Sequence, residues 1–254
     1  MLSLLIWWAG ILLEGLVLAQ GFRAKLATRY SAFYLYILVM FLSDGLLYAL
    51  YRVNVQLFYK WGVFGGYITL FLGCGLLLEI FRHAFGPYAG AEKIAKVTGT
   101  AALIGIVVFA VVYLLIAPRT SAATATFIPL QRNFLLVQAI LLIGLLRVIS
   151  YYEIALGRNL KGMILGFGQC IGTTLIAFAL RAYIGHRFQA ATSYLQQVSY
   201  LSSLVIWLIA LWSYRPNPVP ETRISAEADY DRLASRTRDM VGAASAELVR
   251  VERL

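Results

Sequence analysis

The sequence has very few of the residues from which catalytic and metal centres are usually built. It contains only two histidines and two cysteines among 254 residues. Both cysteines fall inside apolar stretches, and two thiols alone do not make a zinc site. There is no GxSG or HExxH motif, no phosphate-binding loop and no dinucleotide-binding fingerprint. We therefore expect a protein that is not an enzyme and that holds no metal and no cofactor.

Charged residues are also scarce. They make up 13% of the chain, against about 25% in soluble domains. The formal net charge is nevertheless +10, and its location matters. Residues 1–214 contain 15 Lys or Arg and five Asp or Glu, whereas residues 215–254 contain seven of each. The basic excess therefore lies between apolar stretches, where it orients a chain against anionic headgroups. This pattern predicts a lipid bilayer as partner and excludes nucleic acid.

Long apolar runs are what the sequence has in abundance. Seven of them occur between residues 3 and 214, and about 20 such residues cross a hydrocarbon core of about 30 Å as a helix. The fold class that follows is all-α, a polytopic membrane protein with a seven-transmembrane-helix bundle over residues 1–214. The predicted spans are 3–20, 32–50, 61–81, 97–117, 133–150, 162–180 and 194–214.

Residues 215–254 differ in character from the bundle. A proline-rich spacer follows Arg215, and residues 221–254 carry a broken apolar stripe typical of an amphipathic tail helix. The first, third and fifth connections hold more Lys and Arg than the others, which favours the cytoplasm for that side. We expect an external N-terminus, a cytoplasmic C-terminus and an inner (plasma) membrane location. The tail helix could then dock a cytoplasmic protein partner or a second copy of the chain.

Ionisable residues inside the spans are the first candidates for a site. On insertion scales a charge at mid-membrane costs roughly 2.5–3.5 kcal/mol unless it is paired or hydrated. Glu79 and Arg147 each lie about one turn from the cytoplasmic end of a span, which predicts an interhelical charge pair. Arg82 can also reach Glu79, at i+3. The pair is either a structural clasp or a contact that breaks during signalling or transport.

Asp44 is the sharper candidate. It lies in the outer half of the second span and shares a helical face with Tyr48 and Tyr51. Other spans place polar groups at comparable depth, which predicts an outward-facing polar vestibule with Asp44 as its anion, Arg181 near its mouth and Glu14 somewhat deeper. The alternative is that each polar group joins one helix to its neighbour. The remaining predicted members are Gln138, Thr173, Gln196, Ser199 and Ser203.

Three segments carry a resemblance to a known group of proteins. They are Glu79-Ile-Phe-Arg-His83, the turn Gly86-Pro87-Tyr88, and the stretch from Arg132 through Arg147 to Gly162-Met-Ile-Leu-Gly-Phe-Gly168. Together they resemble a family of uncharacterised seven-helix inner-membrane proteins common in acidobacteria. The resemblance implies a bacterial inner membrane, and it supplies no function, cofactor or catalytic residue.

Two functions remain open at this point. The first is a non-enzymatic protein of sensory, receptor-like or scaffolding type, with a ligand in the vestibule and a tail that docks a partner. The alternative is a small-solute or cation/proton-coupled transporter or channel that uses Asp44 and Glu14. A transporter predicts a polar path that continues past the midplane, whereas a receptor predicts a dry, packed inner half below the vestibule.

Overall fold

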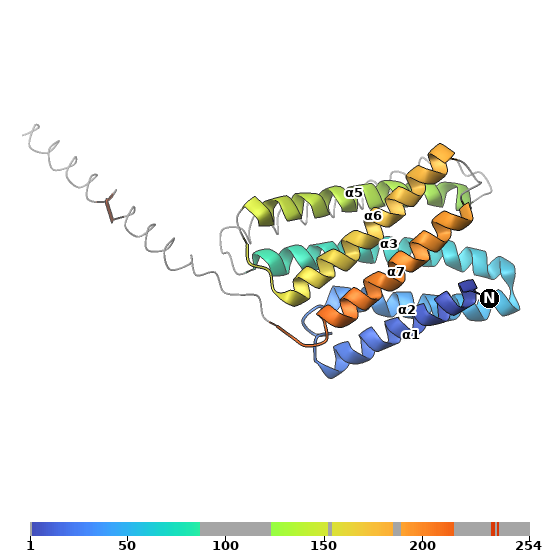
Figure 1. Ribbon diagram of the computed structural model, residues 1–254, viewed down its shortest axis with the longest axis horizontal. Coiled ribbons are helices and arrows are strands. Elements are labelled where there is room, and N and C mark those ends of the chain that lie inside the picture. Colours follow the sequence, from blue (N-terminus) through green and yellow to red (C-terminus); the bar gives the residue numbers. More distant parts are fainter. Residues whose placement is uncertain are drawn as a thin grey trace, which may run out of the picture. The chain divides into compact units, whose positions relative to one another are not determined.

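The computed structural model describes residues 2–86, 123–151, 154–184 and 189–215, together with Ser235, Arg236 and Arg238 of the tail. All regular secondary structure in these residues is helical, as predicted. The chain divides into two units, Met1–Asn217 and Pro218–Leu254. The helices of the first unit (Figure 1) are α1 (Leu2–Arg23), α2 (Ser31–Val53), α3 (Val55–Phe85), α5 (Ala123–Tyr151), α6 (Arg158–Ile184) and α7 (Gln189–Ala210).

Five of these helices are long and apolar enough to cross a membrane, namely α1, α2, α3, α5 and α6. The sixth, α7, has 22 residues but carries glutamines and serines along most of its length. The predicted fourth span, 97–117, lies outside the described residues. So does the predicted tail helix over 221–254, apart from Ser235, Arg236 and Arg238, which are helical.

The described helices form a ring in which each packs against the next and α7 returns to α1, while α3 also contacts α6. Two neighbouring pairs run parallel. Along α3 and α5, the Phe71 ring contacts Phe134, and one turn further on Gln138 donates to the Cys74 sulfur. Along α1 and α7, Glu14 accepts from Tyr200, and further along in both segments Gln20 donates to the Trp212 carbonyl. Figure 1 shows α3 and α5 running the same way.

Basic residues gather at one end of the ring. We call this the basic end; it contains residues 24–30, 86, 154–157 and 211–215, and the opposite end is the far end. Within the described part of the bundle, the basic end and the adjoining turns hold eight Lys or Arg and the far end holds four. The eight are Arg23, Lys25, Arg29, Arg82, Arg147, Arg158, Lys161 and Arg215, and the four are Arg52, Lys60, Arg132 and Arg181.

The connection between α2 and α3 is a single residue, Asn54, where the sequence predicted a loop over 51–60. The Asn54 side-chain oxygen accepts a hydrogen bond from the Leu57 amide at 3.0 Å, which is the typical N-cap of a new helix. The Asn54 amide in turn donates to the Leu50 carbonyl at 2.8 Å and completes α2. One capping residue therefore ends one helix and starts the next.

Two other boundaries differ from prediction. Helix α5 begins at Ala123 rather than near 133, and it continues through Pro129, although a proline usually ends or kinks a helix. Helix α7 ends at Ala210 rather than 214. The Asn159 amide donates to the Ser213 carbonyl at 3.0 Å and its oxygen accepts from the Arg215 amide at 2.9 Å, so this side chain holds the chain that leaves the helix.

The apolar core is concentrated in the basic half of the bundle. Among the largest fully buried side chains of the described residues, all but Leu130 lie in that half or in its adjoining loop. Trp207 of α7 is central, with ring edges against Phe33 and Tyr36 of α2. A Cβ at Gly166 of α6 would overlap the Trp207 indole, so the glycine is what allows α6 and α7 to approach this closely.

Candidate binding cavity

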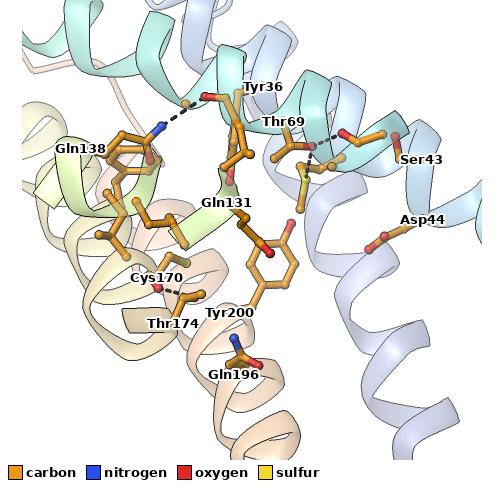
Figure 2. Close-up of a pocket in the computed structure, with 18 of the residues that line it drawn as sticks. Tyr36, Ser43, Asp44, Thr69, Gln131, Gln138, Cys170, Thr174, Gln196 and Tyr200 are labelled. Atoms are coloured by element: carbon orange, nitrogen blue, oxygen red, sulfur yellow. Dashed lines mark hydrogen bonds between the residues drawn. The ribbon is translucent and has the colours of Figure 1, made fainter. Parts of the chain in front are cut away.

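A cavity of about 320 Å³ lies between α2, α3, α5, α6 and α7 (Figure 2). It begins toward the far end of the bundle, beside Gly62 and Gln196, and ends near the middle, at Gln138 and Phe167. Most of its volume therefore lies outside the apolar core described above. The described lining combines aromatic and aliphatic surface with a small number of polar side chains, which is typical of small-molecule sites.

Helix α3 makes room for the cavity by presenting glycines to it. Its residues Gly62, Gly65, Gly66 and Gly73 all line the space. A Cβ at Gly73 would lie 2.9 Å from the Gln138 side-chain nitrogen, so glycine here lets that amide lie flat against α3. The Gln138 amide then donates to the Leu70 carbonyl at 3.1 Å. These glycines of α3 thus form part of a cavity wall.

Asp44 is the one charged side chain among the described residues that line the cavity. It is partly buried, and no hydrogen bond or ion pair to its carboxylate is present within the part of the chain that the structure describes. In Figure 2 it reaches from α2 toward the side of the cavity where Tyr200 stands. Partial burial of a carboxylate without a protein partner costs free energy. A positive charge or ordered water beside Asp44 would reduce that cost.

Glu14 lies just behind the cavity wall. Its side chain is completely buried, and the Tyr200 hydroxyl donates to its Oε1 oxygen. The Oε2 oxygen has no partner among the described atoms. Tyr200 itself lines the cavity, so one phenol separates the buried Glu14 from the space that Asp44 faces. Both predicted carboxylates therefore belong to one site: Asp44 lines the cavity, and Glu14 lies behind its wall.

Several polar side chains of the cavity wall donate their hydrogen bonds to acceptors within the protein. The Thr69 hydroxyl donates to the Gly65 carbonyl at 2.9 Å, and the Thr174 hydroxyl donates to the Cys170 carbonyl at 2.8 Å. The Gln138 amide and the Tyr200 hydroxyl are committed as described above. What these groups leave toward the cavity is oxygen lone pairs, in addition to the carboxylate of Asp44. Tyr36, Ser43, Gln131 and Gln196 also line the cavity, and no protein acceptor for their donor groups is present among the described residues, so the wall offers acceptors and donors.

Three of the predicted vestibule residues line this cavity, namely Asp44, Gln138 and Gln196. A fourth, Arg181, lies next to it: its guanidinium donates to the Gln196 amide oxygen at 2.8 Å and to Thr192 at 2.9 Å. Arg181 therefore joins the end of α6 to the start of α7 and holds a lining residue in place. It does not line the cavity itself.

The other five predicted residues serve as contacts between helices. Thr173 accepts from Ser199 at 2.9 Å across α6 and α7, and Ser203 accepts from the Cys170 thiol at 3.2 Å. Tyr48 packs against the Trp7 and Trp8 rings of α1, and Tyr51 is 56% exposed with its ring against Phe58. Their geometry therefore agrees with the alternative given above, that each polar group joins one helix to its neighbour. This applies to Tyr48, Tyr51, Thr173, Ser199 and Ser203.

The predicted charge pair of Glu79 with Arg147 or Arg82 is wrong. No ion pair joins Glu79 to either arginine in the described residues, and both arginines are exposed. The Glu79 carboxylate instead accepts hydrogen bonds from the first turn of α2: from the Phe33 amide at 2.8 Å, the Ala32 amide at 3.0 Å and the Ser31 hydroxyl at 3.4 Å. Tyr30, the residue before α2, makes no side-chain cap, so Glu79 supplies that cap from α3.

Tyr200 is the site residue that sequence reasoning missed. It lies one helical turn after Gln196, on the stripe that already held predicted polar residues, and this i+4 spacing was the available signal. Ser43, adjacent to Asp44, and Gln131 of α5 also line the cavity without having been predicted. No group of three or more His, Cys, Asp or Glu residues close enough to hold a metal ion occurs in the described residues.

Comparison of the chain with models of protein families, with curated proteins and with solved structures found no match.

Proposed function

We propose that this chain is a receptor-like membrane protein, not an enzyme, that binds a small solute in the cavity around Asp44. The observation that supports this function most strongly is Asp44 itself, a carboxylate on a cavity wall without a partner among the described residues. A buried charge that a fold uses for stability is normally paired, as Glu79 is. An unpaired one beside open space is better explained by a ligand that pairs with it.

The same proposal includes seven spans. Helices α3 and α5 follow each other among the described helices and yet run parallel, and consecutive membrane-crossing helices with the same direction need a crossing between them. Helix α7 packs along both α6 and α1, which are apolar enough to cross, and this supports α7 as a further span. The parallel direction of α1 and α7 agrees with an odd number of crossings.

The orientation follows from the basic end. Its eight Lys or Arg against four at the far end favour the cytoplasm for the basic end. The cavity, in the far half, then opens toward the outside, with the N-terminus outside and the C-terminal tail in the cytoplasm of a bacterial cell. A tail on that side suits a sensory or scaffolding protein, because residues 221–254 can dock a cytoplasmic partner or a second copy.

The packed basic half favours a receptor over a transporter. Below Gln138 and Phe167, the described interior is apolar and close-packed around Trp207, and its polar side chains there mostly bond to main chain. A solute in the cavity has no polar path through this layer. The second candidate, a cation- or proton-coupled transporter, rests on one specific observation: Glu14, buried behind Tyr200, lies deeper than Asp44 and has a free oxygen.

The test is binding in a lipid environment. The full-length protein in lipid nanodiscs would be heated with small amines, carboxylates and polyols, beside an Asp44→Asn variant. A ligand at 100 times its Kd stabilises the folded state by about 2.7 kcal/mol, which shifts the melting temperature measurably. We expect at least one class to stabilise the wild type and not the variant. Stabilisation by none, or equal stabilisation of both, contradicts the proposal. Uptake of the stabilising solute into proteoliposomes would favour the transporter instead.

A further inference from the structure

We infer that the ligand of this cavity is a small organic cation, a primary amine whose ammonium group pairs with the Asp44 carboxylate. This inference rests on the proposed function and names its ligand class. Two properties of the cavity lead to it, its charge and its size and shape, and the hydrogen-bonding groups of the wall are compatible with it.

The charge of the site is negative. Asp44 contributes the one formal charge among the described lining residues, and no Lys or Arg lines the cavity there. Arg181, which bonds to the lining residue Gln196, already donates to Thr192, Ser193 and Gln196. Its guanidinium is therefore used in joining α6 to α7. In a site of low dielectric constant, a lone carboxylate attracts a cation and repels an anion far more strongly than it does in water.

The hydrogen-bonding groups of the wall are compatible with a cation beside Asp44. The hydroxyls of Thr69, Thr174 and Tyr200 donate to protein acceptors, as does the Gln138 amide. These groups present oxygen lone pairs beside the carboxylate, while Tyr36, Ser43, Gln131 and Gln196 keep donors for other polar atoms of a ligand. An ammonium group has three donors and no acceptor, which complements these lone pairs. A carboxylate ligand would place its negative charge beside that of Asp44, with no Lys or Arg in the described lining to offset it.

The volume of about 320 Å³ is at the lower end of the range of roughly 300–1,000 Å³ that is usual for ligand pockets. Apart from Gln138, much of the deep end is apolar: Tyr36 and Phe167 pack edge to face with ring centroids 6.2 Å apart, and Ile171 and Leu135 add to that surface. A ligand with a short apolar body and a cationic head would place its body in the apolar deep end and its head beside Asp44. The Tyr200 ring beside the Asp44 end adds a face on which an ammonium group can rest.

A bare divalent metal ion fits less well. Calcium takes six to eight oxygen ligands, with several carboxylates in its tighter sites, and magnesium needs near-octahedral oxygen coordination. Asp44 is a single carboxylate, and the Glu14 oxygen nearest the cavity wall is occupied by the Tyr200 hydroxyl. One carboxylate with scattered neutral oxygens is instead what a monovalent ammonium group needs.

Cys170 provides a reporter inside the cavity. It lines the space, whereas the other cysteine of the sequence, Cys74, is buried and bonded to Gln138. In a Cys74→Ser background, which keeps an acceptor for that amide, Cys170 is the one thiol. Methanethiosulfonate reagents transfer their thiol half to a cysteine thiolate and release a sulfinate. Three would be compared: aminoethyl (cationic), methyl (neutral) and sulfonatoethyl (anionic), each rate divided by its rate with a free thiol.

We expect the normalised cationic rate to exceed the anionic rate by at least tenfold, and an Asp44→Asn substitution to remove most of that ratio. A second measurement needs no change at Asp44: butylammonium should slow the methyl reagent at Cys170, and butanoate at equal concentration should not. As a control, Tyr183→Cys, at a side chain that is 93% exposed at the end of α6, should show neither effect in a chain without Cys74 and Cys170.

The outcomes separate the two proposals. Labelling of Cys170 at equal normalised rates by all three reagents, with no protection by butylammonium, overturns the cationic ligand and leaves the cavity standing. Failure of every reagent to label Cys170 in the native protein, while the denatured protein is labelled fully, shows that no accessible cavity exists; it overturns both this inference and the proposed function. A preference for the anionic reagent also overturns the ligand class.

Discussion

Helix α2 carries two very different sites at its two ends. At the basic end its first turn is capped by Glu79 of α3, whose carboxylate accepts three hydrogen bonds and lies in the packed, apolar half of the bundle. Toward the far end the same helix carries Asp44, whose carboxylate faces a cavity and has no partner among the described residues. One carboxylate completes the fold, and the other is left for something that the fold does not contain.

The comparison shows what a buried carboxylate needs before it can be assigned a role. Both residues looked alike in the sequence, as single acidic residues in apolar runs. What distinguishes them is the set of donors that the neighbouring helix provides. The unpaired amides at a helix N-terminus stabilise an anion, and α2 begins beside Glu79. Next to Asp44, Ser43 and Leu47 of α2 lie against Gly65 and Gly62 of α3, which have no side chains to donate.

The largest effect is expected from Glu79→Ala. The substitution leaves two amides and one hydroxyl at the start of α2 without their acceptor, and each unsatisfied buried donor costs about 1–3 kcal/mol. We predict a loss of several kcal/mol of unfolding free energy, measured by denaturant titration in mixed micelles. A loss below about 0.5 kcal/mol would show that Glu79 does not cap α2.

A smaller effect is expected where α6 meets α7. Gly166→Ala would place a methyl group against the Trp207 indole in the packed half, and overpacking of this kind costs about 1–3 kcal/mol. The matched control is Gly172→Ala on the same helix, where the added methyl meets nothing within 4 Å. Thermal unfolding of the two variants should separate them clearly. Equal melting temperatures would mean that the two halves of the bundle do not differ in packing as described.

The smallest effects are expected from the two arginines once predicted to pair with Glu79. Arg82 and Arg147 are exposed and make no ion pair with it in the described structure, and substitutions at such sites usually change stability by less than about 0.5 kcal/mol. Arg82→Ala and Arg147→Ala should therefore unfold at the same denaturant concentration as the wild type. A double-mutant cycle with Glu79→Gln that gave a coupling above about 1 kcal/mol would restore the pair.

Much of the fold could be predicted from the sequence, because apolar length alone determines which segments can cross a membrane. The helix boundaries were harder. The single-residue connection at Asn54 depends on one cap, and the start of α5 depends on a helix that continues through Pro129. Neither is visible in hydropathy, which averages over many residues.

The site could be predicted in part. Asp44, Gln138 and Gln196 were identified because polar groups in a membrane avoid lipid and face the interior of the bundle. The same rule could not separate a cavity wall from a helix contact, so Thr173 and Ser199, which bond to each other, were included. The role of Glu79 depends on the register between α2 and α3, and no pattern within one helix reveals that register.

The most direct test of the central claim is the stability of Asp44→Asn without ligand, measured by reversible unfolding in lipid micelles beside Glu79→Gln. If the Asp44 carboxylate is unpaired, the neutral amide of the same shape removes an uncompensated charge, so the variant should be as stable as the wild type or more stable. Glu79→Gln should lose about 1–3 kcal/mol. A loss at Asp44 as large as the loss at Glu79 would show that Asp44 is a structural residue and that the cavity is not built around a free carboxylate.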